Sequence, residues 1–297
     1  AAALKFEDFM FMQYREAAAL HYRGYGTEKM IAQCMGNIED KGKGRQMPIH
    51  YGSPEYNVMT ISSPLATQIP QAAGAGYAYK LDKEDKIAMC YFGDGTASEG
   101  DFHAGLNFAS TTGAQTLFFC RNNGYAISTP TKDQYHGDGI VTRGVAYGIP
   151  SIRVDGTDVL AVYAATQKAR QIIIEKKTPV LIEAMTYRVS HHSTSDDSSR
   201  YRAQSEIDMF TNKFNPITRF EKYLCDKGWW TVEESKAVSD AARKLVFSEL
   251  KRQELLPTHS NEELFTDTTA EMSPILAQQK RETMEHFERN KAYYQKH

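Results

Sequence analysis

Two short polar motifs follow apolar runs in the middle of the chain. Gly93-Asp94-Gly95 comes after the run 86–92, and Asn122-Asn123-Gly124 comes after the run 116–120. The loops at the carboxyl ends of parallel strands meet at one edge of a sheet, so the Asp94 carboxylate and the Asn123 amide can converge there. Mg²⁺ binds such hard oxygen ligands and completes its shell with phosphate oxygens and water. The pair of motifs therefore predicts a magnesium–phosphate site.

The segments around these motifs alternate between strand and helix signals, which predicts an α/β fold with a three-layer parallel sheet. The expected strands are 86–92, 116–120, 151–154 and 180–185; the expected helices are 6–22, 27–35, 70–80, 99–111 and 158–177, the last with Thr157 as its N-cap. Strand signals stop after about Tyr201. We therefore expect an α/β domain over 1–205 and a helical C-terminal region over 206–297, packed on it.

Composition limits the classes of partner. The chain has 297 residues, 41% of them hydrophobic, and a formal net charge of −2, so no global basic field attracts nucleic acid. No apolar run is long enough to cross a bilayer. The start, Ala1–Leu4, shows no charged leader, and the missing Met favours a trimmed or processed chain. The four scattered cysteines favour free thiols over a disulfide framework.

Either motif alone is usually just a turn. Their pairing after two apolar strands is much stronger evidence for a metal site. One alternative from the residues alone stays open, which is a Mg²⁺-dependent phosphate-handling enzyme that uses Asp94 as ligand or nucleophile.

The spacing of GDG and NN resembles the thiamine diphosphate signature of transketolase-like and 2-oxo acid dehydrogenase enzymes. The resemblance is most specific for alpha subunits of branched-chain 2-oxo acid dehydrogenases, and it is carried by residues 13–23, 42–52, 61–78, 93–109, 118–131 and 184–202. It implies the thiamine-diphosphate-binding fold and the oxidative decarboxylation of branched-chain 2-oxo acids. The acyl unit would pass to a lipoyl group, in branched-chain amino acid catabolism.

The resemblance also implies roles for individual residues. Asp94, Asn123 and the Tyr125 carbonyl would hold Mg²⁺, although family members often carry Glu in place of Asp94. The expected thiamine diphosphate neighbours are Gln13, Tyr14, Arg15, Ser63, Leu65, Gly95, Thr96, Arg121 and His192. The expected K⁺ ligands are Ser62, Pro64, Thr67 and Gln68, in a segment that would otherwise be interpreted as a polar turn before a helix.

The polar segment 191–199 follows the last expected strand and should lie at the same sheet edge. By resemblance, His192 is the catalytic residue that positions or protonates the reacting group. Ser193 resembles a regulatory phosphorylation site, with Thr194 and Ser195 as weaker candidates; a phosphate there would add negative charge beside an anionic cofactor. A second site found in some members is replaced by Ala203, so regulation at that position is not expected.

The resemblance implies that the chain is half of an enzyme. The carboxylate that activates the aminopyrimidine ring would come from a beta subunit in an α2β2 heterotetramer. Further expected partners are a lipoyl acyltransferase core, a regulatory kinase and phosphatase, and a small 2-oxo acid. The expected location is the mitochondrial matrix, or the cytoplasm for a bacterial chain. Two alternatives stay open: a pyruvate- or acetoin-type alpha subunit, and a non-catalytic regulatory subunit of the same fold.

Overall fold

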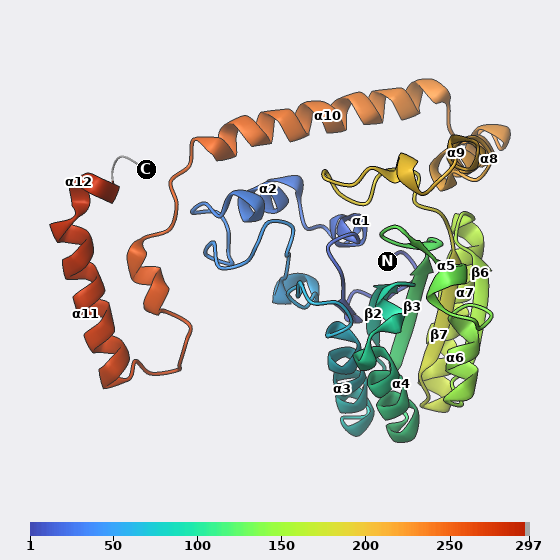
Figure 1. The fold of residues 1–297 in the computed structure, drawn as a ribbon, viewed down its shortest axis with the longest axis horizontal. Helices are drawn as coiled ribbons and strands as arrows, with labels where there is room; N and C mark the ends of the chain where they lie inside the picture. The colour runs from blue at the N-terminus through green and yellow to red at the C-terminus, as the bar shows by residue number, and fades with distance from the viewer. Residues whose placement is uncertain (295–297) are drawn as a thin grey trace.

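A five-stranded parallel sheet forms the core of the α/β part of the chain, on the right-hand side of Figure 1. The computed structural model describes residues 1–294. The sheet order is β1 (Phe9–Phe11), β2 (Ala88–Gly93), β3 (Thr116–Asn122), β7 (Val180–Met185) and β6 (Ser151–Asp155), and every neighbouring pair is parallel. β2 and β7 are buried over nearly their whole length, as expected for strands covered on both faces.

Helices cover both faces of this sheet, so the predicted three layers are confirmed. On one face, α3 (Gln68–Leu81), α4 (Gly100–Thr112) and α6 (Val141–Ala146) lie over a core that includes Phe92 and Phe102. On the other face, α1 (Ala17–Tyr22) and α7 (Val159–Lys176) enclose a second core that includes Leu20 and Ile173. The carboxyl ends of the central strands are left for the loops that follow them.

The packing of α3 explains its small residues. A Cβ added to Gly76 would lie 2.8 Å from the carbonyl carbon of Gln115, and one added to Gly105 of α4 would lie 2.8 Å from Ile69 Cγ2. These contacts are closer than real Cβ atoms tolerate, so glycine lets α3 approach both the start of β3 and the neighbouring helix.

The C-terminal part of the described chain is helical. Its helices are α8 (Gln204–Lys213), α9 (Pro216–Asp226), α10 (Val232–Glu254), α11 (Pro274–Arg289) and α12 (Lys291–Tyr294). The long α10 contacts α2 (Thr27–Met35), and its Gln253 side chain donates a hydrogen bond to the Glu28 carbonyl of α2 at 3.3 Å. Figure 1 shows α11, in red, well away from the sheet. None of the helices in residues 1–294 is long and apolar enough to span a membrane.

Two expectations about elements are wrong. Residues 6–22 do not form one helix, because Phe9–Phe11 pairs with Ala88–Cys90 as the edge strand β1 before α1 begins. A short apolar run fits the periodicity of a helix as well as that of a strand, and here the pairing with β2 makes the segment a strand. The N-cap of α7 is Asp158, whose carboxylate accepts hydrogen bonds from the backbone of residues 160 and 161, while the Thr157 hydroxyl donates to Asp155.

Candidate functional site

A cavity of about 420 Å³ opens at the carboxyl ends of β1, β2, β3 and β7. Five segments that are distant in sequence form its wall: one follows each of the strands β1, β2, β3 and β7, and one precedes α3. Every residue predicted to contact thiamine diphosphate, and every predicted Mg²⁺ ligand, lines this cavity: Gln13, Tyr14, Arg15, Ser63, Leu65, Asp94, Gly95, Thr96, Arg121, Asn123, Tyr125 and His192. The fold therefore brings the predicted residues together, while their roles remain predictions.

Asp94 lies at the base of this cavity with 1% of its surface exposed. Its Oδ1 accepts a hydrogen bond from the backbone amide of Asn123 at 3.0 Å, and its Oδ2 is buried without a partner in the described structure. Burial raises the pKa of the Asp94 carboxyl, against the opposing effects of the Asn123 amide and Arg121. A buried carboxylate oxygen that lacks a donor suits a cation, so the residues fit a Mg²⁺ ion.

The turn after β3 places the second predicted metal ligand. The Asn123 side-chain oxygen accepts a hydrogen bond from the Tyr125 amide at 3.2 Å, which fixes its orientation. Gly124 adopts φ +84, a conformation that other residues rarely take. Gly95 is needed for a different reason, because an added Cβ would lie 2.9 Å from Ala126 Cβ. The glycines of both motifs therefore let the two turns meet.

Residues 1–294 contain no group of three or more His, Cys, Asp or Glu side chains arranged to hold a metal. A site with one carboxylate, one amide and one carbonyl agrees with that finding, because Mg²⁺ commonly takes most of its oxygens from phosphate and water.

Three arginines line the cavity and give it an anion-binding character. Arg15 and Arg121 were predicted, whereas Arg188 was not. Arg121 Nη1 pairs with the buried Glu16 at 2.7 Å, and Arg188 donates to the Ile127 carbonyl at 2.7 Å while its Nη1 is buried without a partner in the described structure. Guanidinium groups match phosphate or carboxylate oxygens geometrically. Arg188 lies on the loop three residues after β7 ends, and the fold brings this loop to the cavity.

His192 lies on the loop after β7, at the edge of the cavity. Its backbone carbonyl accepts a hydrogen bond from Arg15 at 2.8 Å, and its amide donates to Asp196 at 2.8 Å. Burial lowers the pKa of His192, and Arg15 and Arg188 lower it further. The imidazole is therefore neutral at neutral pH and can accept a proton or donate a hydrogen bond.

Arg202 anchors the rest of this loop. It is buried among the rings of Tyr125, Tyr187 and Tyr201, and its guanidinium donates to the Ser190 carbonyl at 3.0 Å. The same loop carries the three candidate phosphorylation residues, and all three are exposed: Ser193, Thr194 and Ser195. An enzyme could reach them without unfolding the core.

The segment predicted to bind K⁺ forms a tight turn at the start of α3. Thr67 Oγ1 donates to the Pro64 carbonyl at 3.3 Å, Ala66 adopts φ 70, and Gln68 donates to the Tyr91 carbonyl of β2 at 2.9 Å. Ser62 precedes this turn on the same segment. The four predicted ligands thus lie within one short segment, 62–68, that leads into α3.

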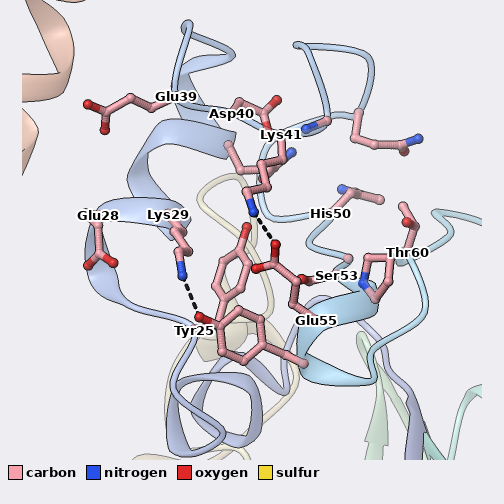
Figure 2. A pocket seen from close by; sticks show the side chains of 16 residues that line it. Tyr25, Glu28, Lys29, Glu39, Asp40, Lys41, His50, Ser53, Glu55 and Thr60 are labelled. Atoms are coloured by element: carbon pink, nitrogen blue, oxygen red, sulfur yellow. Dashed lines mark hydrogen bonds and ion pairs between the residues drawn. The ribbon is translucent and has the colours of Figure 1, made fainter. Parts of the chain in front are cut away.

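A larger cavity of about 700 Å³ lies beside α2 and does not contain the predicted site residues (Figure 2). Tyr25, Lys29 and Glu55 line it, and the ion pair between Lys41 and Glu55 crosses it. His50 connects the two cavities, because it lines the larger one and its Nε2 lies 2.6 Å from the hydroxyl of Ser63 in the smaller one. Size alone therefore does not identify the chemical site.

The cavity at the sheet edge offers an unpartnered carboxylate oxygen and three arginines, and this set of groups suits an anion together with a divalent cation. The chain belongs to the dehydrogenase E1 component family, which residues 1–262 match.

Among its relatives, the chain is 53% identical over 294 residues to "2-oxoisovalerate dehydrogenase subunit alpha, mitochondrial" of Macaca fascicularis, covering 99% of this chain and 66% of that protein. It is 52% identical to the protein of the same name from Homo sapiens over the same shares. The protein of that name from Caenorhabditis elegans is 51% identical, with 99% of this chain and 68% of that protein covered. The chain thus spans about two thirds of the length of the relatives that it matches.

Proposed function

We propose that this chain acts as the alpha subunit of a thiamine-diphosphate-dependent branched-chain 2-oxo acid dehydrogenase, 3-methyl-2-oxobutanoate dehydrogenase (2-methylpropanoyl-transferring). The observation that carries the proposal is the unpartnered Oδ2 of Asp94 in a cavity lined by arginines. The names of the relatives support the branched-chain substrate class and a mitochondrial location. A pyruvate-type alpha subunit would use the same cofactor site, but the names of the relatives do not support pyruvate as the substrate.

In this proposal the cavity holds the metal–diphosphate end of the cofactor. Asp94, Asn123 and the Tyr125 carbonyl hold Mg²⁺, and Arg15 and Arg121, with Tyr14, receive the diphosphate oxygens. Bound thiamine diphosphate supplies an electron sink for decarboxylation. His192, neutral near pH 7, orients the substrate and moves a proton at its imidazole nitrogen. The turn with Ser62, Pro64, Thr67 and Gln68 binds K⁺ and stiffens the wall that carries Ser63 and Leu65.

The proposal includes partners. A beta subunit completes the active site in an α2β2 heterotetramer, and a lipoyl acyltransferase core takes the acyl unit. A kinase and a phosphatase act on the exposed Ser193, or on Thr194 or Ser195. A phosphate on Ser193 would place negative charge next to His192 and would repel an anionic substrate. We also propose the division into an α/β domain, 1–205, and a helical region, 206–297.

The test is to co-express the chain with a branched-chain-type beta subunit and to measure decarboxylation with an artificial electron acceptor. The assay contains Mg²⁺ and thiamine diphosphate and compares 3-methyl-2-oxobutanoate with pyruvate. We expect cofactor-dependent activity that prefers the branched acid and is lost in Asp94→Ala. A preference for pyruvate would keep the mechanism and refute the substrate.

The same experiment separates the remaining alternatives. A well-formed heterotetramer that binds the cofactor but lacks activity would favour a non-catalytic regulatory subunit. Turnover of phosphoesters without thiamine diphosphate would favour a phosphate-handling enzyme that uses Asp94.

A further inference from the structure

Glu16 is a buried carboxylate beside the cavity that none of the predicted roles uses. It is the N-cap residue of α1, and only 7% of its side chain is exposed. Its Oε1 lies 2.7 Å from Arg121 Nη1, and its Oε2 accepts a hydrogen bond from the backbone amide of Gln13 at 2.7 Å. Both carboxylate oxygens are therefore engaged, each by a different wall of the cavity.

These two contacts join segments that are far apart in the sequence. Gln13 belongs to the segment after β1, and Arg121 lies near the end of β3. Gln13 also reaches the wall after β2, because its Nε2 donates to Thr96 Oγ1 at 3.1 Å. Among the residues that the structure describes, Glu16 is the only ion-pair partner of Arg121. One carboxylate thus sets the position of a guanidinium and of the backbone that leads to Tyr14 and Arg15.

Neither fold stability nor charge attraction explains a carboxylate at this place. Burial raises the pKa of Glu16, although Arg121 and the Gln13 amide oppose the change. A raised carboxyl pKa means that the ionised form costs folding free energy at neutral pH. The negative charge also weakens the attraction between Arg121 and an anion in the cavity. Both effects disfavour a carboxylate at position 16, so the remaining explanation for it is the geometry of its two contacts.

We infer that Glu16 is a positioning residue for diphosphate binding, which holds Arg121 and the Gln13 backbone in the arrangement that receives the phosphate oxygens. The inference rests on the proposed function, since it assumes a diphosphate in this cavity. Glu16 acts through Arg121 and does not touch the ligand. The ion pair holds one end of the guanidinium and so reduces the entropy that Arg121 loses when an anion binds.

Glu16→Gln tests this inference, because glutamine keeps the shape but replaces one acceptor oxygen with a donor. The amide nitrogen must then face either Arg121 or the Gln13 N–H, so one contact is lost. We would measure the Kd of thiamine diphosphate with Mg²⁺, and of inorganic pyrophosphate with Mg²⁺, by calorimetry on the chain co-purified with a branched-chain-type beta subunit. We expect Kd to rise about tenfold or more for both ligands, as for loss of a charge-assisted hydrogen bond.

The melting temperature without ligand separates positioning from a structural role. We expect Glu16→Gln to melt near the wild-type temperature, because removal of the buried negative charge offsets the cost of the lost hydrogen bond. Weaker binding accompanied by an equal loss of stability would overturn the inference in favour of a structural role. Unchanged or tighter binding would also overturn it, since that is the result expected if Glu16 acted only through its charge. Glu175→Gln, at an exposed position of α7, is the matched control.

A double-mutant cycle tests whether Glu16 acts through Arg121. In the Arg121→Ala background, Glu16→Gln should raise Kd by much less than it does in the wild type. Full additivity of the two effects would overturn the inference. A wild-type complex that binds neither ligand would refute the proposed function and this inference with it, whereas normal wild-type binding with an unaffected Glu16→Gln variant would refute the inference alone.

Discussion

At the scale of single residues, the site contains groups that lower the free energy of unfolding when no ligand is bound. Asp94 buries a carboxylate oxygen that has no donor, and burial raises its pKa. A carboxyl whose pKa is higher in the folded than in the unfolded state stabilises the folded state at low pH. This stabilisation is lost as the pH rises from the pKa of the unfolded state to the pKa of the folded state. At neutral pH the ionised Asp94 therefore costs stability, which a bound cation can restore.

Asp94→Asn should consequently separate folding from metal binding. Without Mg²⁺ we expect the variant to melt at or above the wild-type temperature, since it buries no charge. Mg²⁺ with inorganic pyrophosphate should raise the wild-type melting temperature and leave that of the variant nearly unchanged. At about 100 times Kd the wild-type gain corresponds to about 2.7 kcal/mol. Differential scanning fluorimetry measures both, and equal Mg²⁺ stabilisation of the two proteins would contradict the metal role.

His192 gives a prediction about pH. Because burial, Arg15 and Arg188 lower its pKa, the neutral imidazole persists to a pH below the ordinary histidine range. Activity that needs neutral His192 should therefore decline only on the acid side of that range. His192→Asn should lower decarboxylation by about 10²–10⁴-fold, the usual contribution of a positioned proton-transfer group. Cofactor Kd should change much less, and a parallel loss of binding would indicate a structural residue instead.

The site residues could be predicted where a motif follows a strand, as Asp94, Asn123 and Arg121 do. Glu16 and Arg188 were missed, because a lone Glu or Arg on an expected helix or loop is usually a solvated side chain. Their role depends on which segment lies opposite, and no spacing in the sequence reports that.

At the scale of elements, the cavity depends on how closely α3 approaches β3. Gly76→Ala should be destabilising, because the added Cβ would meet the Gln115 backbone at 2.8 Å and Thr116 Oγ1 at 2.1 Å. We expect a loss of about 1–3 kcal/mol, as for overpacking of a core. Gly74 in the same helix has nothing within 4 Å of an added Cβ, so Gly74→Ala should be neutral or stabilising. Thermal unfolding of both variants checks this, and similar effects would argue against the close approach.

The strands β2, β3 and β7 were predictable because they are buried on both faces and so have near-continuous apolar sequences. β1 was not, since three residues carry too little pattern to separate a strand from a helical turn. Its identity comes from the pairing of Phe9–Phe11 with Ala88–Cys90, which lies 79 positions further along the chain.

At the scale of the whole molecule, the helical region exposes apolar surface that a single chain leaves uncovered. Val238, Leu245 and Phe247 of α10 are exposed, and no residue of α11 is buried. Exposed apolar surface of this extent is typical of an interface between proteins. Since α10 contacts the rest of the described chain mainly at α2 and α9, most of its length is available to the proposed beta subunit.

Phe247→Glu should therefore weaken assembly without weakening the fold. The ring is 58% exposed, so replacing it should leave the melting temperature of the free chain nearly unchanged. Burying the new carboxylate against an apolar partner surface costs several kcal/mol, so less beta subunit should co-purify. Ser239→Glu, which adds the same charge at another exposed position of α10, should assemble like the wild type. Undiminished co-purification of Phe247→Glu would place the partner on a different face of the molecule, and the exposed residues of α10 would then need another explanation.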